Sequence, residues 1–161
     1  MAADDALTTL FRHNLWANLR LLDACAGLTD EQLDATLVGT FGSIRSTLQH
    51  ITLSERSYFT RISTGRPYSA SRDQAPSIAE MAEMLRASGA GLIEWAPTVQ
   101  PDDVVAVNWD GEMINVPKSV ILTQTINHAT EHRAQVAAIL TRLGIEPPDM
   151  SGWHFFDMVI A

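Results

Sequence analysis

The chain has 161 residues, 46% hydrophobic and 19% charged, a composition typical of a single soluble globular domain over residues 1–161. Its 19 acidic and 11 basic residues give a net charge of -8, which argues against nucleic acid as a partner because phosphate binding depends on clustered Lys and Arg. Its apolar runs are shorter than the ~20 residues that cross a bilayer, and acids follow Met1 where a signal peptide has bases, so we expect a cytoplasmic protein with no membrane partner.

Helical periodicity dominates the first half of the chain. Apolar residues recur about every 3.6 residues over residues 4–26, and Gly27 ends this first predicted helix. Residues 29–32 predict a short capped turn, and a second helix is predicted over residues 43–63. Each long helix has an apolar face, which predicts that the helices pack together.

The second half of the chain predicts two more helices and a hairpin. Residues 65–76 have no period and are expected to form a surface loop, after which a capping box opens a third helix over residues 77–95. Two β-prone runs within residues 104–116 flank Asp-Gly, a strong signal for a tight hairpin turn. The fourth helix is predicted over residues 117–143, and an apolar, aromatic tail follows it.

These elements predict an all-α fold. Four amphipathic helices with one decorated connection favour a four-helix bundle that carries a small β-hairpin between its third and fourth helices. We expect the apolar tail to pack on the bundle or on a second subunit, because an exposed tail of this composition would promote aggregation.

Two histidines in the fourth predicted helix give the strongest chemical signal. His128 and His132 are four residues apart, so both imidazoles lie on one helix face with about 6 Å of rise between them. A single metal ion binds such pairs in other helical sites, and a chance pair on a surface helix is the alternative. Both histidines lie at the edge of the buried face, where a polar side chain needs a hydrogen bond or a metal.

A matching polar row on the second predicted helix contains His50. Small polar residues flank it on the same face, leaving space beside the imidazole; they are Ser43, Thr47, Ser54 and Ser57. If the second and fourth helices face each other, His50 supplies a third nitrogen beside His128 and His132. Three neutral imidazoles with open coordination positions are typical of a catalytic metal site.

Glu55 and Cys25 are further candidates. Glu55 interrupts the apolar face of the second helix, and we consider it as a catalytic residue, either a general base or an acceptor near His50. An ion pair with an arginine is the alternative role. Cys25 is the only cysteine and has no evident activating base nearby, so we expect it to pack rather than to react.

The remaining polar candidates are expected to have mainly structural roles. We expect His13 to be a hydrogen-bonded core residue and His154 to pack among the aromatic residues of the tail. Glu131 is expected on the solvated face of its helix. Asn14 and Asn18 lean inward on the first helix, where they either orient a ligand or satisfy backbone groups.

Segments on three predicted helices resemble the DinB/YfiT-like superfamily. The segments are Trp16-Ala-Asn18 followed by Leu21-Leu22, Gly42 to Ile51, and Asn127 to Gln135. The resemblance implies a four-helix bundle with up-down-down-up topology, frequently a homodimer. It also implies a divalent metal ion, zinc or nickel among the commonest, held by His50, His128 and His132.

The resemblance further implies an activity on small molecules. Relatives include S-transferases that use bacillithiol or similar low-molecular-weight thiols, mycothiol-dependent isomerases and some hydrolases. Many relatives have His-His-Arg-Gly-Gln where this chain has Glu131-His-Arg-Ala134-Gln, so the surroundings of the site differ.

Three functions are therefore open. We expect a metal-dependent enzyme that joins a small thiol cosubstrate to an electrophilic small-molecule substrate. The first alternative is a metal-dependent hydrolase of a small amide or ester with Glu55 as its base. The second is a non-enzymatic, metal-binding, stress-related dimer.

Overall fold

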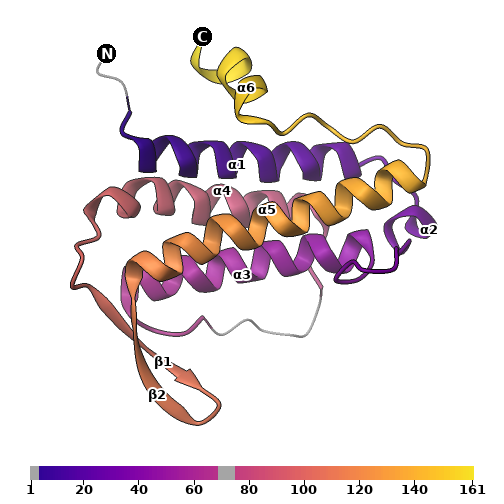
Figure 1. Cartoon of the computed structure of the whole chain (residues 1–161). Helices are drawn as coiled ribbons and strands as arrows, with labels where there is room; N and C mark the ends of the chain where they lie inside the picture. Colours follow the sequence, from indigo (N-terminus) through magenta and orange to yellow (C-terminus); the bar gives the residue numbers. More distant parts are fainter. Residues whose placement is uncertain (1–3, 69–74) are drawn as a thin grey trace.

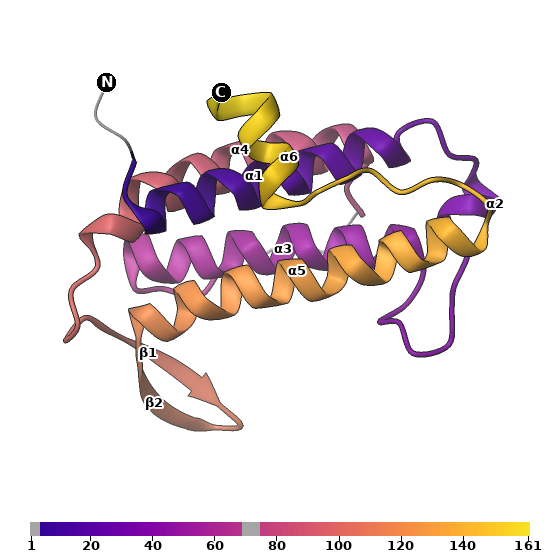
Figure 2. The same ribbon diagram turned by 45° about the horizontal axis from the view of Figure 1, so that its top comes forward.

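A computed structural model describes residues 4–68 and 75–161, so part of the predicted surface loop over residues 65–76 lies outside the described residues. Four long helices lie side by side (Figures 1 and 2): α1 (Ala6–Cys25), α3 (Ile44–Thr64), α4 (Ile78–Trp95) and α5 (Lys118–Arg142). The shorter elements are α2 (Asp30–Leu33), η1 (Ala96–Thr98), β1 (Val104–Trp109), β2 (Glu112–Pro117), α6 (Gly152–Phe155) and η2 (Phe156–Ile160). The prediction of a mainly helical fold with a small antiparallel hairpin is confirmed.

Side-chain caps determine where the long helices begin. The carboxylate of Asp5 accepts hydrogen bonds from two backbone N–H groups in the first turn of α1. Ser77 and Glu80 form the predicted capping box at the start of α4. At the end of α3, Gly65 adopts a left-handed conformation with φ of 70°, which a residue with a side chain adopts only with strain.

The hairpin turns at Asp110 and Gly111, which have φ angles of 52° and 95°. Two successive positive φ angles define the type I′ turn that matches the twist of paired strands. β1 and β2 pair in antiparallel register from Val104 opposite Pro117 to Trp109 opposite Glu112. The hairpin projects beyond the first turns of α5 (Figure 1), so it stands beside the end of the bundle rather than inside it.

Two apolar clusters fill the interior of the bundle. The first apolar cluster contains Leu21, Leu22, Cys25, Leu33, Ile44, Leu48, Met81, Leu85, Val136, Ile139 and Leu140. The second apolar cluster contains Phe11, Ile62, Leu92, Ala96, Val105, Ile121 and Leu122. Along α1 and α5 the chain passes from the second cluster to the first, whereas along α3 and α4 it passes from the first to the second.

A buried polar layer separates the two apolar clusters. It contains Asn14 and Asn18 from α1, Glu55 from α3, Ser88 from α4 and Arg133 from α5, all at most 4% exposed. Both asparagine amides donate to one carboxylate oxygen of Glu55 at 2.9 Å, and the Ser88 hydroxyl donates to the other at 2.7 Å. Arg133 donates to both asparagine carbonyls, at 2.8 and 2.7 Å. All four long helices are thus joined by one hydrogen-bonded network.

The C-terminal segment packs on α1 through a single buried aromatic ring. Phe155 is 3% exposed and contacts the rings of His13 and Trp16, while Trp153 is 84% exposed. His154 also packs against Trp16, and Nε2 of His13 donates a hydrogen bond to the backbone carbonyl of Met150 at 2.8 Å. The expected structural roles of both histidines agree with these contacts. Among the described residues, no helix is long and apolar enough to cross a membrane.

Candidate metal site

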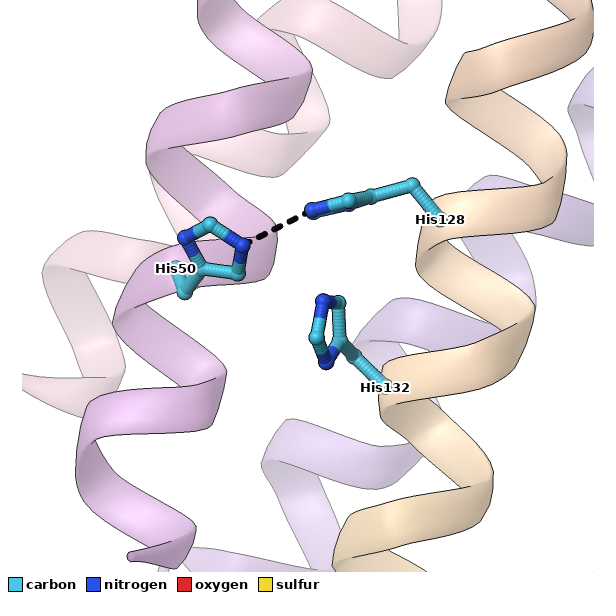
Figure 3. Close-up of side chains that lie close together, drawn as sticks. All are labelled: His50, His128 and His132. Atoms are coloured by element: carbon cyan, nitrogen blue, oxygen red, sulfur yellow. Dashed lines mark hydrogen bonds between the residues drawn. The ribbon is translucent and has the colours of Figure 1, made fainter. Parts of the chain in front are cut away.

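Three imidazoles from two neighbouring helices meet at one point (Figure 3). His50 projects from α3, and His128 and His132 project from successive turns of α5. One ring nitrogen from each histidine can be chosen so that all three lie within 4.8 Å of one another. The structure therefore brings together the three histidines that the sequence placed on two separate helices.

The packing of α5 explains why these two histidines face α3. Ala129 and Val136 are buried on the same side of α5, and the four-residue spacing puts His128 and His132 beside that apolar stripe. His132 is 7% exposed, whereas His50 and His128 are half-buried. The cluster is thus covered on the bundle side and accessible from outside.

His50 and His128 share a hydrogen bond between their Nε2 atoms, 2.8 Å apart (Figure 3). One ring must donate and the other must accept, so at least one of the two is neutral. Burial, followed by the effects of His132 and His50, lowers the pKa of His128 to about 4. Burial, followed by the effect of His132, also lowers the pKa of His50. Near neutral pH these imidazoles are uncharged and have lone pairs for a ligand.

Gln135 orients the third histidine. Its side-chain oxygen lies 2.9 Å from Nδ1 of His132 and also accepts the backbone N–H of Phe41 at 3.0 Å. Because a carboxamide oxygen only accepts hydrogen bonds, Nδ1 of His132 carries a proton, which leaves Nε2 as the ring nitrogen available to a ligand. Glu131 is exposed, as expected, and accepts a longer hydrogen bond of 3.3 Å from the Gln135 amide.

Two aromatic rings border the histidines. Phe41 stacks on His50 with ring centroids 4.1 Å apart and an interplanar angle of 12°, and its edge contacts His132. Tyr58 meets His128 edge to face with centroids 5.8 Å apart. The sequence gives no signal for either ring, because Phe41 lies in the loop before α3 and Tyr58 packs against the second apolar cluster.

The donor set fits a divalent metal ion. Imidazole nitrogen is a preferred ligand of zinc, nickel and copper, and three protein ligands leave coordination positions for other molecules. The His132–Gln135 hydrogen bond is the kind of outer contact that fixes a ligand's tautomer in metal sites. The 2.8 Å contact between His50 and His128 would have to open for both Nε2 atoms to bind one ion.

Glu55 lies in the polar layer rather than among the histidines. Its carboxylate accepts hydrogen bonds from Asn14, Asn18 and Ser88, and it is 2% exposed. Burial raises its pKa to about 7, against the opposing effects of its hydrogen bonds and of Arg133. The side chain therefore joins α3 to α1 and α4, and the role of Glu55 as a catalytic base stays a prediction.

The two asparagines have a role that the sequence analysis did not foresee. Asn14 and Asn18 were expected to orient a ligand or to satisfy backbone groups. Their side chains instead connect Glu55 to Arg133, donating to the carboxylate and accepting from the guanidinium. The expectation failed because a single helix reveals which residues point inward but not which side chains they meet there.

Comparison with known proteins agrees with this architecture. A family model described as the DinB family matches residues 2–159. The chain belongs to the DinB family. Among solved structures, the DinB fold of this chain is similar to a crystal structure of a DinB-like protein from Bacillus cereus ATCC 10987, with a TM-score of 0.62 and 18% sequence identity. That match covers 86% of this chain and 91% of the other, and no curated protein matches significantly.

Proposed function

We propose that this DinB protein is a divalent-metal-dependent enzyme that transfers a small thiol to an electrophilic small molecule. The observation that carries the proposal is the convergence of His50, His128 and His132, whose donor atoms lie within 4.8 Å. Zinc or nickel suits three imidazoles, and a low-molecular-weight thiol of the bacillithiol type suits the resemblance to thiol-dependent DinB relatives.

The side chains of the site have distinct roles in this proposal. His50, His128 and His132 offer ring nitrogens as ligands, Gln135 accepts the proton of His132 Nδ1 and so leaves Nε2 for the metal, and Phe41 covers one face of His50. A bound divalent metal lowers the pKa of a thiol or a water molecule, so that a nucleophile exists near neutral pH. The thiol proton leaves to solvent, sulfur bonds to the electrophilic carbon, and the leaving group departs with its bonding electrons.

The single cysteine supports an external source of sulfur. Cys25 is fully buried in the first apolar cluster, and burial raises its pKa to about 11. A thiol in this state is protonated near neutral pH and has no access to substrate. The nucleophile of the proposed reaction therefore comes from a cosubstrate.

Hydrolysis of a small amide or ester is the less favoured proposal. It needs Glu55 to act as a base at the histidines, whereas hydrogen bonds from three neighbouring side chains occupy both of its carboxylate oxygens. Loss of hydrolysis in Glu55→Gln with retained metal would support it. A non-enzymatic metal-binding dimer is the third proposal.

Metal content and a thiol titration test the transferase proposal. We expect elemental analysis to find stoichiometric divalent metal in the wild type and in His13→Ala, and none in His128→Ala. After cobalt substitution, a thiol that binds at the site is expected to add a sulfur-to-cobalt charge-transfer band. Absence of metal would contradict the enzyme proposals, and a cobalt spectrum unchanged by every thiol tested would favour the non-enzymatic dimer.

The wider setting of the enzyme is part of the same proposal. We propose that residues 1–161 act as one domain with the up-down-down-up bundle topology of the family and the hairpin in its third connection. We also propose that the protein works in the cytoplasm as a homodimer. The acidic net charge of -8 supports a small molecule, rather than nucleic acid, as its partner.

A further inference from the structure

A pocket beside the hairpin lies one helical turn from the histidines. This hairpin pocket has a volume of about 410 Å³, within the size range of small-molecule sites. Its wall includes Ser57, Tyr58 and Arg61 from α3, Val107 and Trp109 from β1, and Gln124 from α5. The pocket therefore depends on the hairpin as well as on the two helices that carry the histidines.

Tyr58 connects the hairpin pocket to the candidate metal site. It lines the pocket, and its ring meets His128 edge to face with centroids 5.8 Å apart. On α5, Gln124 lies one turn before His128, and on α3, Ser57 lies two turns after His50. The pocket and the histidines therefore lie along the same two helices.

Of the described residues that line the hairpin pocket, Arg61 alone has a charged side chain. Its Nε lies 3.5 Å from the hydroxyl oxygen of Ser57, which directs the guanidinium along α3 toward the histidines. Within residues 4–68 and 75–161, no ion pair joins Arg61 to a carboxylate. Arginine presents a planar set of donors that matches a carboxylate in a two-point contact.

The opposite wall of the pocket is apolar. Val107 and Trp109 of β1 face it, together with Val116 of β2 and Val120 and Ile121 around the start of α5. Pockets with apolar and aromatic walls and one charged group typically hold the hydrocarbon part of a ligand against the walls. The charged group then fixes the orientation of the ligand, here by pairing with a carboxylate. Much of this wall belongs to the hairpin, whose Val105 is also anchored in the second apolar cluster.

We propose that the hairpin pocket binds a small carboxylic acid as the substrate of the proposed transferase. The carboxylate pairs with Arg61, the apolar or aromatic body lies against Val107 and Trp109, and the reacting group points to the histidines. Seven residues separate His50 from Ser57, about 10 Å of helix rise, which sets the length of the molecule. The reacting role rests on the proposed function, whereas acid binding by the pocket does not.

Binding of a simple organic acid to the metal-free protein tests the pocket directly. The probes are 4-phenylbutanoate and its neutral amide, 4-phenylbutanamide, each titrated with ligand-observed NMR. We expect the wild type to bind the acid about tenfold more tightly than the amide, the size of a hydrogen bond to a charged group. Arg61→Gln is expected to abolish this preference. Arg142→Gln, which removes the same charge from the exposed end of α5, is expected to retain it.

A second variant keeps the test informative if Arg61→Gln does not fold. Trp109 is 59% exposed, so Trp109→Ala should fold, and we expect it to weaken the binding of acid and amide alike. Equal affinity of the wild type for both probes, an acid preference that survives Arg61→Gln, or unchanged affinities in Trp109→Ala would overturn the proposal. Because the metal-free protein is used, these outcomes are independent of metal content, which tests the transferase proposal separately.

Discussion

The side-chain oxygen of Gln135 lies 2.9 Å from Nδ1 of His132, one turn earlier on the same helix. The same oxygen accepts the backbone N–H of Phe41 at 3.0 Å, which links the loop before α3 to α5. The carboxamide of Gln135 therefore fixes the tautomer of His132. It also holds the backbone of Phe41, whose ring covers His50. The candidate metal site thus depends on a residue that is not one of its three histidines.

Gln135→Ala is expected to weaken metal binding without removing a ligand. His132 would lose the hydrogen-bond partner that holds its proton on Nδ1. Loss of a hydrogen bond to a metal-ligating histidine typically lowers metal affinity by about 10–100-fold. Competition with a chromophoric chelator measures the change. Thr141→Ala serves as the control, because Thr141 is exposed on the same helix and its hydroxyl donates to the backbone carbonyl of Ala137. Equal affinities in wild type and Gln135→Ala would remove Gln135 from the site.

Phe41→Ala is expected to weaken metal binding by a smaller amount. The ring stacks on His50 at 4.1 Å, and such aromatic contacts stabilise by roughly 0.5–1.5 kcal/mol, up to about tenfold in affinity. Val38→Ala in the same loop removes a fully exposed side chain and is the matched control. The same chelator competition applies. A metal affinity in Phe41→Ala equal to that of Val38→Ala would show that the stacked ring does not support His50.

Glu55 is expected to make stability depend on pH. Its pKa of about 7 in the folded protein lies above the ordinary value of 4.5, so the folded state binds the proton more tightly than the unfolded state. The stabilisation from this proton is complete below about pH 4.5 and is lost as pH rises through 7. The shift corresponds to at most about 3 kcal/mol.

Urea unfolding of metal-free protein at pH 5 and pH 8 measures this effect. Other groups also titrate in this range, so the quantity to compare is the difference in unfolding free energy between wild type and Glu55→Gln. We expect the wild type to lose stability relative to the variant between pH 5 and pH 8, because only the wild type releases this proton. A difference that does not change with pH would show that Glu55 keeps the same charge in both states.

Gly91→Ala is expected to destabilise the bundle even though alanine favours helices. A methyl group at this position on α4 would overlap the aromatic ring of Phe59 on α3. Overpacking of this kind typically costs about 1–3 kcal/mol, more than the roughly 1 kcal/mol gained in helix propensity. Thermal or urea unfolding measures the balance. The double variant with Phe59→Leu, which has a smaller side chain, should recover part of the loss, and a stabilised Gly91→Ala would contradict the close approach.

The helices and the histidines were predictable from the sequence for a simple reason. A period of 3.6 residues identifies both the buried face of each helix and the face that His50, His128 and His132 share with neighbouring polar residues. The capping box at Ser77 and the Asp-Gly turn of the hairpin are equally local signals, and both appear in the structure.

Contacts between distant segments were not predictable in the same way. Phe41 stacks on His50 from a loop without any period, and Arg61 lines a pocket that exists only because the hairpin folds beside α3. The pairing of Glu55 with Asn14 and Asn18 depends on the rotation and the axial offset of α1 against α3. The rotation and the offset are determined by packing among all four long helices, so they cannot be read from the sequence of one amphipathic helix.

The burial of Cys25 has a consequence for chemical labelling. In the proposed transferase an accessible thiol of the protein would be alkylated by the electrophilic substrate, but Cys25, the one cysteine of the sequence, is shielded by burial and held in its protonated form. Reaction with an alkylating reagent therefore requires the packing around the end of α1 to open. The rate of that reaction reports how often the bundle opens at this end, so the protein contains its own single-site probe of conformational fluctuation.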